Sequence, residues 1–353
     1  MNYDTPVASQ DLIAALDANG NISAPTLVAI QNALGITGTE DVPVTVGTFD
    51  GTNTTAPDGQ GVDVLLVTPP APSDPNAVVN LEIPAEILAS ASAYVFQTTA
   101  NIAVEFNTVE RVIVSGSGND HITVNGDRNT TLEGAAGDDT LITSGGNDSI
   151  TGGEGNDSIS AGAGSDTIVS GVGNDTIDAG AGRDVVAFAG DKADYTVDLV
   201  DGKLVVAGAA GTSTVSNAEF ISFNNGESVA VASTAEEATV LRLYQGILGR
   251  DADQEGADYW VNVNNTDATS LVGIANAFLL STELNAGGSL TDEQFIDVLY
   301  ANAFGRSADA EGKAYWLNDL ANGQERANVA INIVGSEEAA ATVDNVILIT
   351  GQI

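Results

Sequence analysis

Hydrophobic residues follow three different patterns along this chain. From about Val42 to Val114 they form short runs of the kind that builds strands, and from about Ala235 they recur every three to four residues, as in helices. Between Gly134 and Ala187 a single branched aliphatic residue recurs every nine residues, which predicts a solenoid. The pattern therefore predicts a mainly β protein with helical parts, organised around a central array of repeats.

The array consists of six nine-residue units in unbroken register. Glycine is always at the fourth place, aspartate at the sixth and a branched aliphatic at the eighth. Glycines at the first, second and fourth places allow positive φ, so each unit predicts a tight turn followed by a three-residue strand. In that strand only the aliphatic side chain points inward. The units are GAAGDDTLI, TSGGNDSIT, GGEGNDSIS, AGAGSDTIV, SGVGNDTID and AGAGRDVVA.

The aspartates of the array indicate a bound cation. Stacked carboxylates without a counter-charge would repel one another strongly. Carboxylate and carbonyl oxygens, with no His or Cys in the six units, favour calcium over zinc or copper. The sixth-place residues are Asp139, Asp148, Asp157, Asp166, Asp175 and Asp184.

The unit GGEGNDSIS, residues 152–160, fits the pattern GGxGxDxUx at every place, and the array resembles the β-roll of the RTX (repeats-in-toxin) family. The resemblance implies a right-handed coil of two units, with several calcium ions shared between turns eighteen residues apart. It pairs Asp139 with Asp157, Asp157 with Asp175, Asp148 with Asp166, and Asp166 with Asp184. The implied ligands are these aspartates, Asp120, and the turn residues Gly116, Gly118, Gly137, Gly146, Gly153, Gly155, Gly162, Gly164, Gly171, Gly173, Gly180 and Gly182.

One further unit precedes the array, after an irregularity. SGSGNDHIT, residues 115–123, carries Asp120 at the sixth place. The segment VNGDRNTTLE that follows has ten residues and no aspartate at that place, and it contains Arg128. We expect this irregularity to cost one ion.

Composition and charge exclude several classes of binding partner. The 353 residues are enough for two or three domains, and 49 acidic against 10 basic residues give a net charge of −39, which argues against nucleic acid or an anionic membrane as partner. No cysteine is present. The N-terminus lacks the basic and apolar regions of a cleavable signal peptide, and no segment is long and apolar enough to insert into a membrane. The RTX resemblance implies type I secretion through an uncleaved C-terminal signal, with which the ending VDNVILITGQI is compatible, and hence a secreted, extracellular or cell-surface location.

The segments flanking the array predict its ends. Ser9 and Ser23 can each cap a short helix, and the apolar faces of this helical hairpin should dock on the next domain or on another molecule. The β region after it is expected to add metal-free coils that cap the solenoid, with a separate β-sandwich as the alternative. The expected organisation is a helical hairpin over 1–40, a capping β region over 41–114, the calcium-binding β-roll over 115–187, a β tail over 188–233, and an all-α domain with the secretion signal over 234–353.

The last domain contains a duplication. The segments LYQGILGRDADQEGADYW and LYANAFGRSADAEGKAYW align at an offset of fifty-six residues. Their pattern LGRxxDxxGxxYW resembles a helical domain of unknown function, DUF4214, found in type I secreted bacterial proteins. Acidic residues from Asp251 onward resemble part of an EF-hand loop, but the twelfth place is Asn262. We prefer helix capping by Asp253 and Asp309, turns at Gly256 and Gly312, arginines Arg250 and Arg306 bonded within the fold, and a core position for Tyr259, Trp260, Tyr315 and Trp316.

The sequence predicts no enzyme. No HExxH motif exists, the only histidine is His121 in a repeat strand, and no GxSxG site with a histidine partner is present. Residue types alone leave carboxylate-only glycosidase chemistry open, but the paired acids belong to repeats or turns. Two classes remain: a calcium-dependent structural protein that self-associates into a layer or filament, similar in plan to RTX surface-layer proteins, and an adhesin that binds cell-surface polysaccharide through the helical domain.

Overall fold

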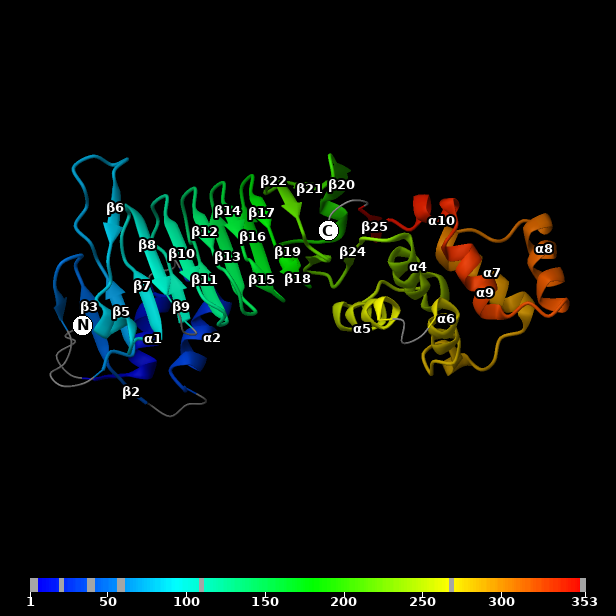
Figure 1. Cartoon of the computed structure of the whole chain (residues 1–353), viewed down its shortest axis with the longest axis horizontal. Coiled ribbons are helices and arrows are strands. Elements are labelled where there is room, and N and C mark those ends of the chain that lie inside the picture. Colours follow the sequence, from blue (N-terminus) through cyan, green and yellow to red (C-terminus); the bar gives the residue numbers. More distant parts are fainter. Residues whose placement is uncertain are drawn as a thin grey trace. The chain divides into compact units, whose positions relative to one another are not determined.

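The computed structural model describes residues 6–18, 22–36, 42–55, 61–107, 111–266 and 270–349. The chain divides into two compact units (Figure 1). The first contains the chain up to Ala189 together with residues 193–198 and 203–218, and the second contains Glu219 onward together with residues 190–192 and 199–202.

The first unit is a parallel β-solenoid whose successive strands alternate between two sheets. In the repeats each coil adds one strand to each sheet, and registers such as Thr140↔Ser158 and Ser149↔Thr167 advance by eighteen residues, as the resemblance implied. One sheet runs in the order β3 (Val46–Phe49), β5 (Val64–Val67), β7 (Ala93–Phe96), β9 (Arg111–Val114), β11 (Thr130–Glu133), β13 (Ser149–Glu154), β16 (Thr167–Val172) and β19 (Val185–Phe188). The other runs β6 (Val78–Leu81), β8 (Asn101–Asn107), β10 (His121–Asn125), β12 (Thr140–Ile142), β14 (Ser158–Ser160), β17 (Thr176–Asp178) and β22 (Gly211–Ser216).

The strands before the repeats continue the same two sheets. β9 pairs in parallel with β11, and β8 pairs in parallel with β10, so the strands from β5 to β9 form further coils of the solenoid instead of a sandwich of their own. Short elements join them: β4 (Thr54–Thr55) is antiparallel to β3, and α3 (Ala85–Leu88) lies between β6 and β7. This part supplies aromatic core residues, such as Tyr94 and Phe106, that the repeats lack.

The interior of the repeats is a narrow ladder of aliphatic side chains. The eighth-place residues are all buried, and residues one coil apart face each other in register, as Leu141, Ile159 and Ile177 do. Each coil of eighteen residues thus buries only two of these side chains, and their burial must offset the entropy lost when the whole coil is ordered. The ladder consists of Leu141, Ile150, Ile159, Ile168, Ile177 and Val186.

Two N-terminal helices cover one face of the solenoid. The helices are α1 (Ser9–Asp17) and α2 (Ala24–Ala33), and their buried residues Leu12, Leu16 and Ile30 pack on strand side chains, most of them in the first sheet, so they dock within the chain. Ser23 caps α2 as predicted and accepts a bond from the backbone N of Thr26 at 3.4 Å. The prediction that Ser9 caps α1 was wrong, because the N-cap of this helix is Ala8. The strand residues on which the two helices pack are Val44, Val46, Val64, Leu66, Ala93, Val95, Val112 and Val114.

Ser9 has another role in the N-terminal segment. Its Oγ accepts a bond from the backbone N of Val42 at 3.1 Å, which ties the start of α1 to the chain just before β2 (Pro43–Val44). There β1 (Val7–Ala8) and β2 form an antiparallel pair. Because the partner of Ser9 is distant in sequence, the local capping pattern could not reveal it.

Strands of the β tail close the end of the array. β22 pairs in parallel with β17, where the next coil would stand, and β21 (Lys203–Gly208) pairs with β22 in antiparallel fashion. β20 (Thr196–Val200) lies next to β21 in the strand order, and η1 (Lys192–Asp194) precedes it. On the turn side β15 (Ala163–Gly164) pairs with β18 (Ala181–Gly182).

The second unit combines β-strands with a group of helices. β24 (Ser228–Ala232) lies between β23 (Phe220–Phe223), which is antiparallel to it, and β25 (Val346–Leu348), which is parallel. Four residues of the expected secretion signal, 350–353, lie outside the described residues. The described chain has no helix that meets the length and hydropathy needed to cross a bilayer. The helices are α4 (Ala235–Leu243), η2 (Tyr244–Leu248), α5 (Gln254–Asn265), α6 (Leu271–Leu279), η3 (Leu284–Gly287), α7 (Asp292–Phe304), α8 (Ala310–Ala321), α9 (Arg326–Val334) and α10 (Glu337–Thr342).

Candidate metal centre

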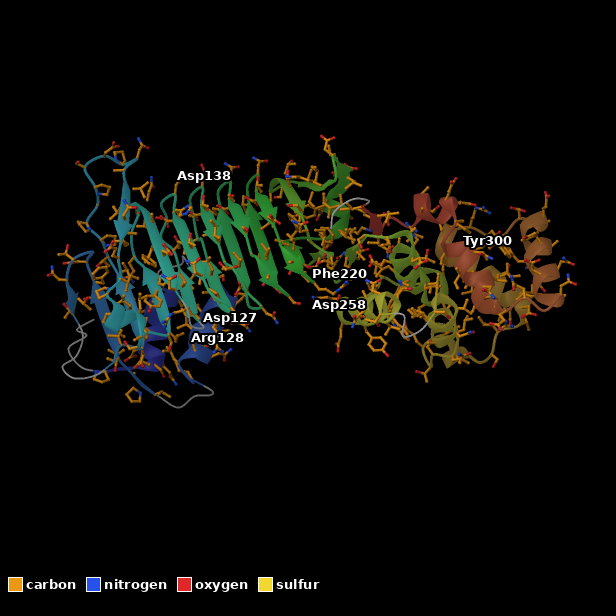
Figure 2. The ribbon with its side chains drawn as sticks, viewed as in Figure 1. Asp127, Arg128, Asp138, Phe220, Asp258 and Tyr300 are labelled. Carbon is orange, nitrogen blue, oxygen red and sulfur yellow. The ribbon has the colours of Figure 1, made fainter. Side chains whose placement is uncertain are left out.

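The aspartates of the repeats form two ladders, one along each row of turns. Figure 2 shows Asp138 at one edge of the strands and Asp127 with Arg128 at the opposite edge. In each ladder the backbone N of one aspartate donates to Oδ1 of the aspartate one coil later. The bonds run from Asp139 to Asp157 (2.9 Å), Asp157 to Asp175 (3.0 Å), Asp148 to Asp166 (2.7 Å) and Asp166 to Asp184 (2.8 Å). The structure thus brings together the four pairs that the resemblance implied.

The second carboxylate oxygen of the ladder aspartates, Oδ2, is the atom that can bind a cation. Oδ2 of Asp139, Asp148, Asp157 and Asp166 is buried and has no hydrogen-bond partner. Burial raises the pKa of Asp139 to about 8, helped by the charges of neighbouring aspartates, and raises the pKa of Asp157 and of Asp166 to about 6. A buried, partnerless carboxylate oxygen is costly, and a cation beside it would remove that cost. These oxygens therefore fit a calcium ion.

Backbone carbonyls share the space in front of these oxygens. A Cβ built on Gly134 would lie 2.6 Å from Oδ2 of Asp139 and 2.4 Å from the carbonyl O of Gly152. The next coil repeats this arrangement at Gly152. Within the described residues, no group of three or more His, Cys, Asp or Glu side chains converges, so turn carbonyls would have to supply much of a calcium shell, in keeping with its preference for six to eight oxygens.

Glycine is required where successive turns stack. A Cβ on Gly155, which has φ +130°, would lie 2.0 Å from the carbonyl O of Gly137 in the preceding coil. All the predicted turn glycines from Gly137 to Gly182 have positive φ, whereas Gly116 and Gly118 do not. These two glycines lie against the backbone of the preceding coil, which leaves no room for a Cβ atom. The close approach of the two backbones, and not a positive φ, therefore requires glycine at these positions.

The irregular ten-residue segment leaves a gap in one ladder. Thr130 stands where the ladder would place an aspartate, and its backbone N donates to Oδ1 of Asp148 at 2.7 Å. Arg128 and Asp127 are exposed at the adjoining turn (Figure 2). Asp148 therefore has no carboxylate before it in its ladder, which supports the expected loss of one ion. His121 is exposed on β10, as expected of a surface strand residue.

Three serines missed by the sequence analysis contact ladder aspartates. Oδ2 of Asp175 accepts hydrogen bonds from the hydroxyls of Ser170 and Ser213, and Oδ2 of Asp120 accepts one from the hydroxyl of Ser115. The repeat spacing gave a partial signal, because Ser115 and Ser170 both occupy the first place of a unit, where the other two units of the same ladder have Gly134 and Gly152. Ser213 lies outside the repeats and gave none.

The duplicated motif of the second unit has a structural role in both copies. Asp253 accepts a bond from the backbone N of Gly256 at 2.8 Å, and Asp309 accepts the equivalent bond from Gly312 at 2.8 Å, so both aspartates cap helices as predicted. Both glycines lie in the first turn of a helix. The expected turns at these glycines were therefore wrong.

The two arginines of the motif are bonded within the fold, as predicted. Arg250 pairs with Glu283 at 2.6 Å and lies over the ring of Tyr244, and Arg306 pairs with Glu338 at 2.5 Å and lies over the ring of Tyr300. The first acidic residue of the EF-hand-like loop is also engaged: Oδ1 of Asp251 accepts a bond from Nδ2 of Asn345 at 2.5 Å.

The tyrosines of the motif are not core residues, contrary to expectation. Tyr259 is 60% exposed and Tyr315 is 58% exposed, whereas Trp260 and Trp316 are partly buried. In each copy the two rings make an edge contact with centroids 4.8 Å apart. Adjacent residues on a helix point in different directions, so the tryptophan turns inward and the tyrosine faces solvent.

Comparison with known protein families agrees with this geometry. The family described as RTX calcium-binding nonapeptide repeat (4 copies) matches residues 124–159 and 151–186, and the domain of unknown function DUF4214 matches residues 212–287 and 275–343. The chain therefore contains RTX calcium-binding repeats and a DUF4214 region. Neither the curated proteins nor the solved structures yielded a match.

Proposed function

We propose that this chain is a non-enzymatic, calcium-dependent structural protein of the cell exterior. The observation that carries the proposal is the set of buried, partnerless carboxylate oxygens in the two ladders. In a calcium-poor cytosol these carboxylates oppose folding, and outside the cell calcium would fill the turns and fold the solenoid. The lack of the HExxH and GxSxG motifs supports a role without catalysis.

We further propose that the folded molecules associate at the cell surface into a layer, filament or matrix. A net charge of −39 keeps molecules apart, and bound calcium would neutralise part of it. The apolar faces of α1 and α2 are buried within the chain, which leaves the second unit as the better candidate for contacts. Leu280 there is 81% exposed, and Tyr259 and Tyr315 are also exposed.

Sedimentation velocity of the purified chain tests association. Millimolar-range calcium is expected to produce large species that chelator disperses. The triple variant Leu280→Ser, Tyr259→Ser, Tyr315→Ser should weaken association, and Val172→Ser, which changes an exposed apolar residue of the first unit, is its control. A monomer boundary at high protein concentration in calcium would rule out association.

Secretion without cleavage completes the proposal, supported by the RTX repeats. Deleting the last fifty or so residues would also remove β25, which pairs with β24, so a truncation would confuse export with misfolding. Intact mass of protein recovered from the medium is the cleaner test. A mass that corresponds to a start well beyond Tyr3 would contradict export without cleavage.

A second candidate function is the binding of cell-surface polysaccharide by the second unit. The observation that favours it is the exposure of Tyr259 and Tyr315 at matched places in the two copies of the motif. Exposed tyrosines offer an apolar ring face together with a polar hydroxyl. Retention of the chain on immobilised polysaccharide, lost in Tyr259→Ala with Tyr315→Ala, would support this function, and equal retention of the double variant would contradict it.

A further inference from the structure

Two aspartates of the array differ from their neighbours in how Oδ2 is used. Oδ2 of Asp175 accepts bonds from the hydroxyls of Ser170 and Ser213, the latter at 3.1 Å, and the two hydroxyls lie 3.1 Å apart. Oδ2 of Asp120 accepts bonds from the hydroxyl of Ser115 and from the backbone N of Gly116 at 3.2 Å. All three serines are at most 3% exposed. These carboxylates therefore have partners where Asp139 and Asp157 have none.

Within this ladder, the residue at the first place of the unit accounts for the difference. Within the same ladder that place is Gly134 before Asp139 and Gly152 before Asp157, and the space in front of Oδ2 stays open. Ser115 and Ser170 occupy the equivalent place and put a hydroxyl into that space. A hydroxyl at this place is not sufficient, because Thr143 of the other ladder donates to the carbonyl O of Ala161 at 2.7 Å and leaves Oδ2 of Asp148 without a partner.

Both serine-bonded aspartates stand at the ends of their ladder. Beyond Asp175 the sheet continues with β22, and the register Thr176↔Thr214 places Ser213 beside Asp175 where another coil would carry an aspartate. Before Asp120, the register His121↔Ala103 places Ile102 at the equivalent position. An ion at either end would find a carboxylate on one side only, and it would have to displace hydroxyl groups that already satisfy the buried oxygen.

We propose that Ser115 and Ser170, the latter with Ser213, are ion-excluding end residues that keep Oδ2 of Asp120 and Asp175 out of calcium coordination. The ladder then binds calcium only through its interior, and hydrogen bonds close both of its ends. This inference rests on the proposed function, because it assumes that the partnerless oxygens of the interior bind calcium.

Calcium titration of the full chain tests the inference by comparing the same substitution in adjacent coils. Equilibrium dialysis gives the number of bound ions, and circular dichroism gives the calcium midpoint of folding. Asp175→Asn should leave the number unchanged and the midpoint within about twofold, whereas Asp157→Asn should lose at least one ion and raise the midpoint by about tenfold, equivalent to about 1.4 kcal/mol. Loss of an ion in Asp175→Asn would overturn the proposal that the serines exclude calcium, and it would leave the proposed calcium binding by the interior aspartates standing. An unchanged count in Asp157→Asn would overturn the exclusion and the proposed function together.

A second pair of variants tests whether the serines cause the exclusion. Ser170→Gly with Ser213→Ala removes both hydroxyls and gives this unit the residue that Gly134 and Gly152 provide at the first place in the same ladder. We expect this double variant to fold at calcium concentrations at least about threefold lower, and Asp175→Asn in the same background to cancel the gain. An unchanged midpoint in the double variant, with a normal calcium-saturated dichroism spectrum, would show that the serines do not exclude calcium.

Discussion

Replacing one interior ladder aspartate by asparagine should have opposite effects with and without calcium. Asp157 suits this test because its Oδ1 accepts the backbone N of Asp139 at 2.9 Å while its Oδ2 has no partner. Asparagine has the same shape and keeps an acceptor for that bond, so Asp157→Asn removes mainly the charge.

Without calcium, Asp157→Asn should stabilise the solenoid. Burial raises the pKa of Asp157 from 3.8 to about 6. The charged carboxylate therefore lowers the free energy of unfolding by its full amount above about pH 6, and this penalty disappears as the pH falls to 3.8, the pKa in the unfolded state. Two pKa units correspond to roughly 3 kcal/mol, and the buried amide group that asparagine puts in place of Oδ2 reduces the gain to about 2 kcal/mol. The variant should therefore gain about 2 kcal/mol at neutral pH in chelator.

With calcium the same change should destabilise the solenoid. Each ion bound at a hundred times its dissociation constant stabilises the folded state by about 2.7 kcal/mol, and Asp157 lies between two coils that would share ions with it. Loss of one or two ions exceeds the 2 kcal/mol gain, so a net loss of about 1–3 kcal/mol is expected in calcium.

Urea unfolding followed by circular dichroism, in calcium and in chelator, measures both effects. The control is Asp127→Asn, which removes a charge from an exposed turn residue of the same solenoid. The control should change stability by less than about 0.5 kcal/mol in either condition. The reasoning is refuted if Asp157→Asn is less stable than the unaltered protein in chelator as well as in calcium.

Three further predictions address the turns, the N-terminal helices and pH. Gly155→Ala should destabilise the solenoid by roughly 3 kcal/mol or more in thermal unfolding, because its Cβ would lie 2.0 Å from a backbone oxygen. The control is Gly226→Ala, which should cost only about 1–2 kcal/mol, because Gly226 has φ +82° but no atom within 4 Å of the added Cβ. Glu133→Ala should cost about 2 kcal/mol and increase hydrogen exchange in α2, because Glu133 accepts bonds from the backbone N and hydroxyl of Ser23; unchanged exchange would contradict this. Calcium-free protein should become less stable as the pH rises from about 4 to about 8, because the pKa values of the ladder aspartates rise from 3.8 in the unfolded state to about 6 for Asp157 and about 8 for Asp139 in the folded state. A constant urea midpoint over this range would refute the prediction.

The repeat period made much of the solenoid predictable. A nine-residue register fixes which residue points inward and which residues stack one coil later, so the burial of Ile159 and the pairing of Asp139 with Asp157 followed from spacing and family resemblance. The helix caps Asp253 and Asp309 were predictable for a similar reason, since capping depends on residues only three positions apart.

Features that depend on distant contacts were not predictable. Ser9 was expected to cap a helix, but it bonds the backbone of Val42, thirty-three residues later. Ser213 reaches Asp175 across thirty-eight residues from a strand outside the repeats, so no periodic pattern marks it. The exposure of Tyr259 follows from the direction in which α5 packs, and composition alone favoured the core for an aromatic residue.

Hydrogen exchange of the backbone amides, with and without calcium, tests the central claim most directly. The amides of Asp139, Asp148, Asp157 and Asp166 all donate to ladder carboxylates, so they report on the proposed sites themselves. Calcium-dependent folding predicts strong protection of these amides in calcium and its loss in chelator, while the helices of the second unit stay protected in both conditions. Protection of the ladder amides that persists after complete removal of calcium would contradict the claim.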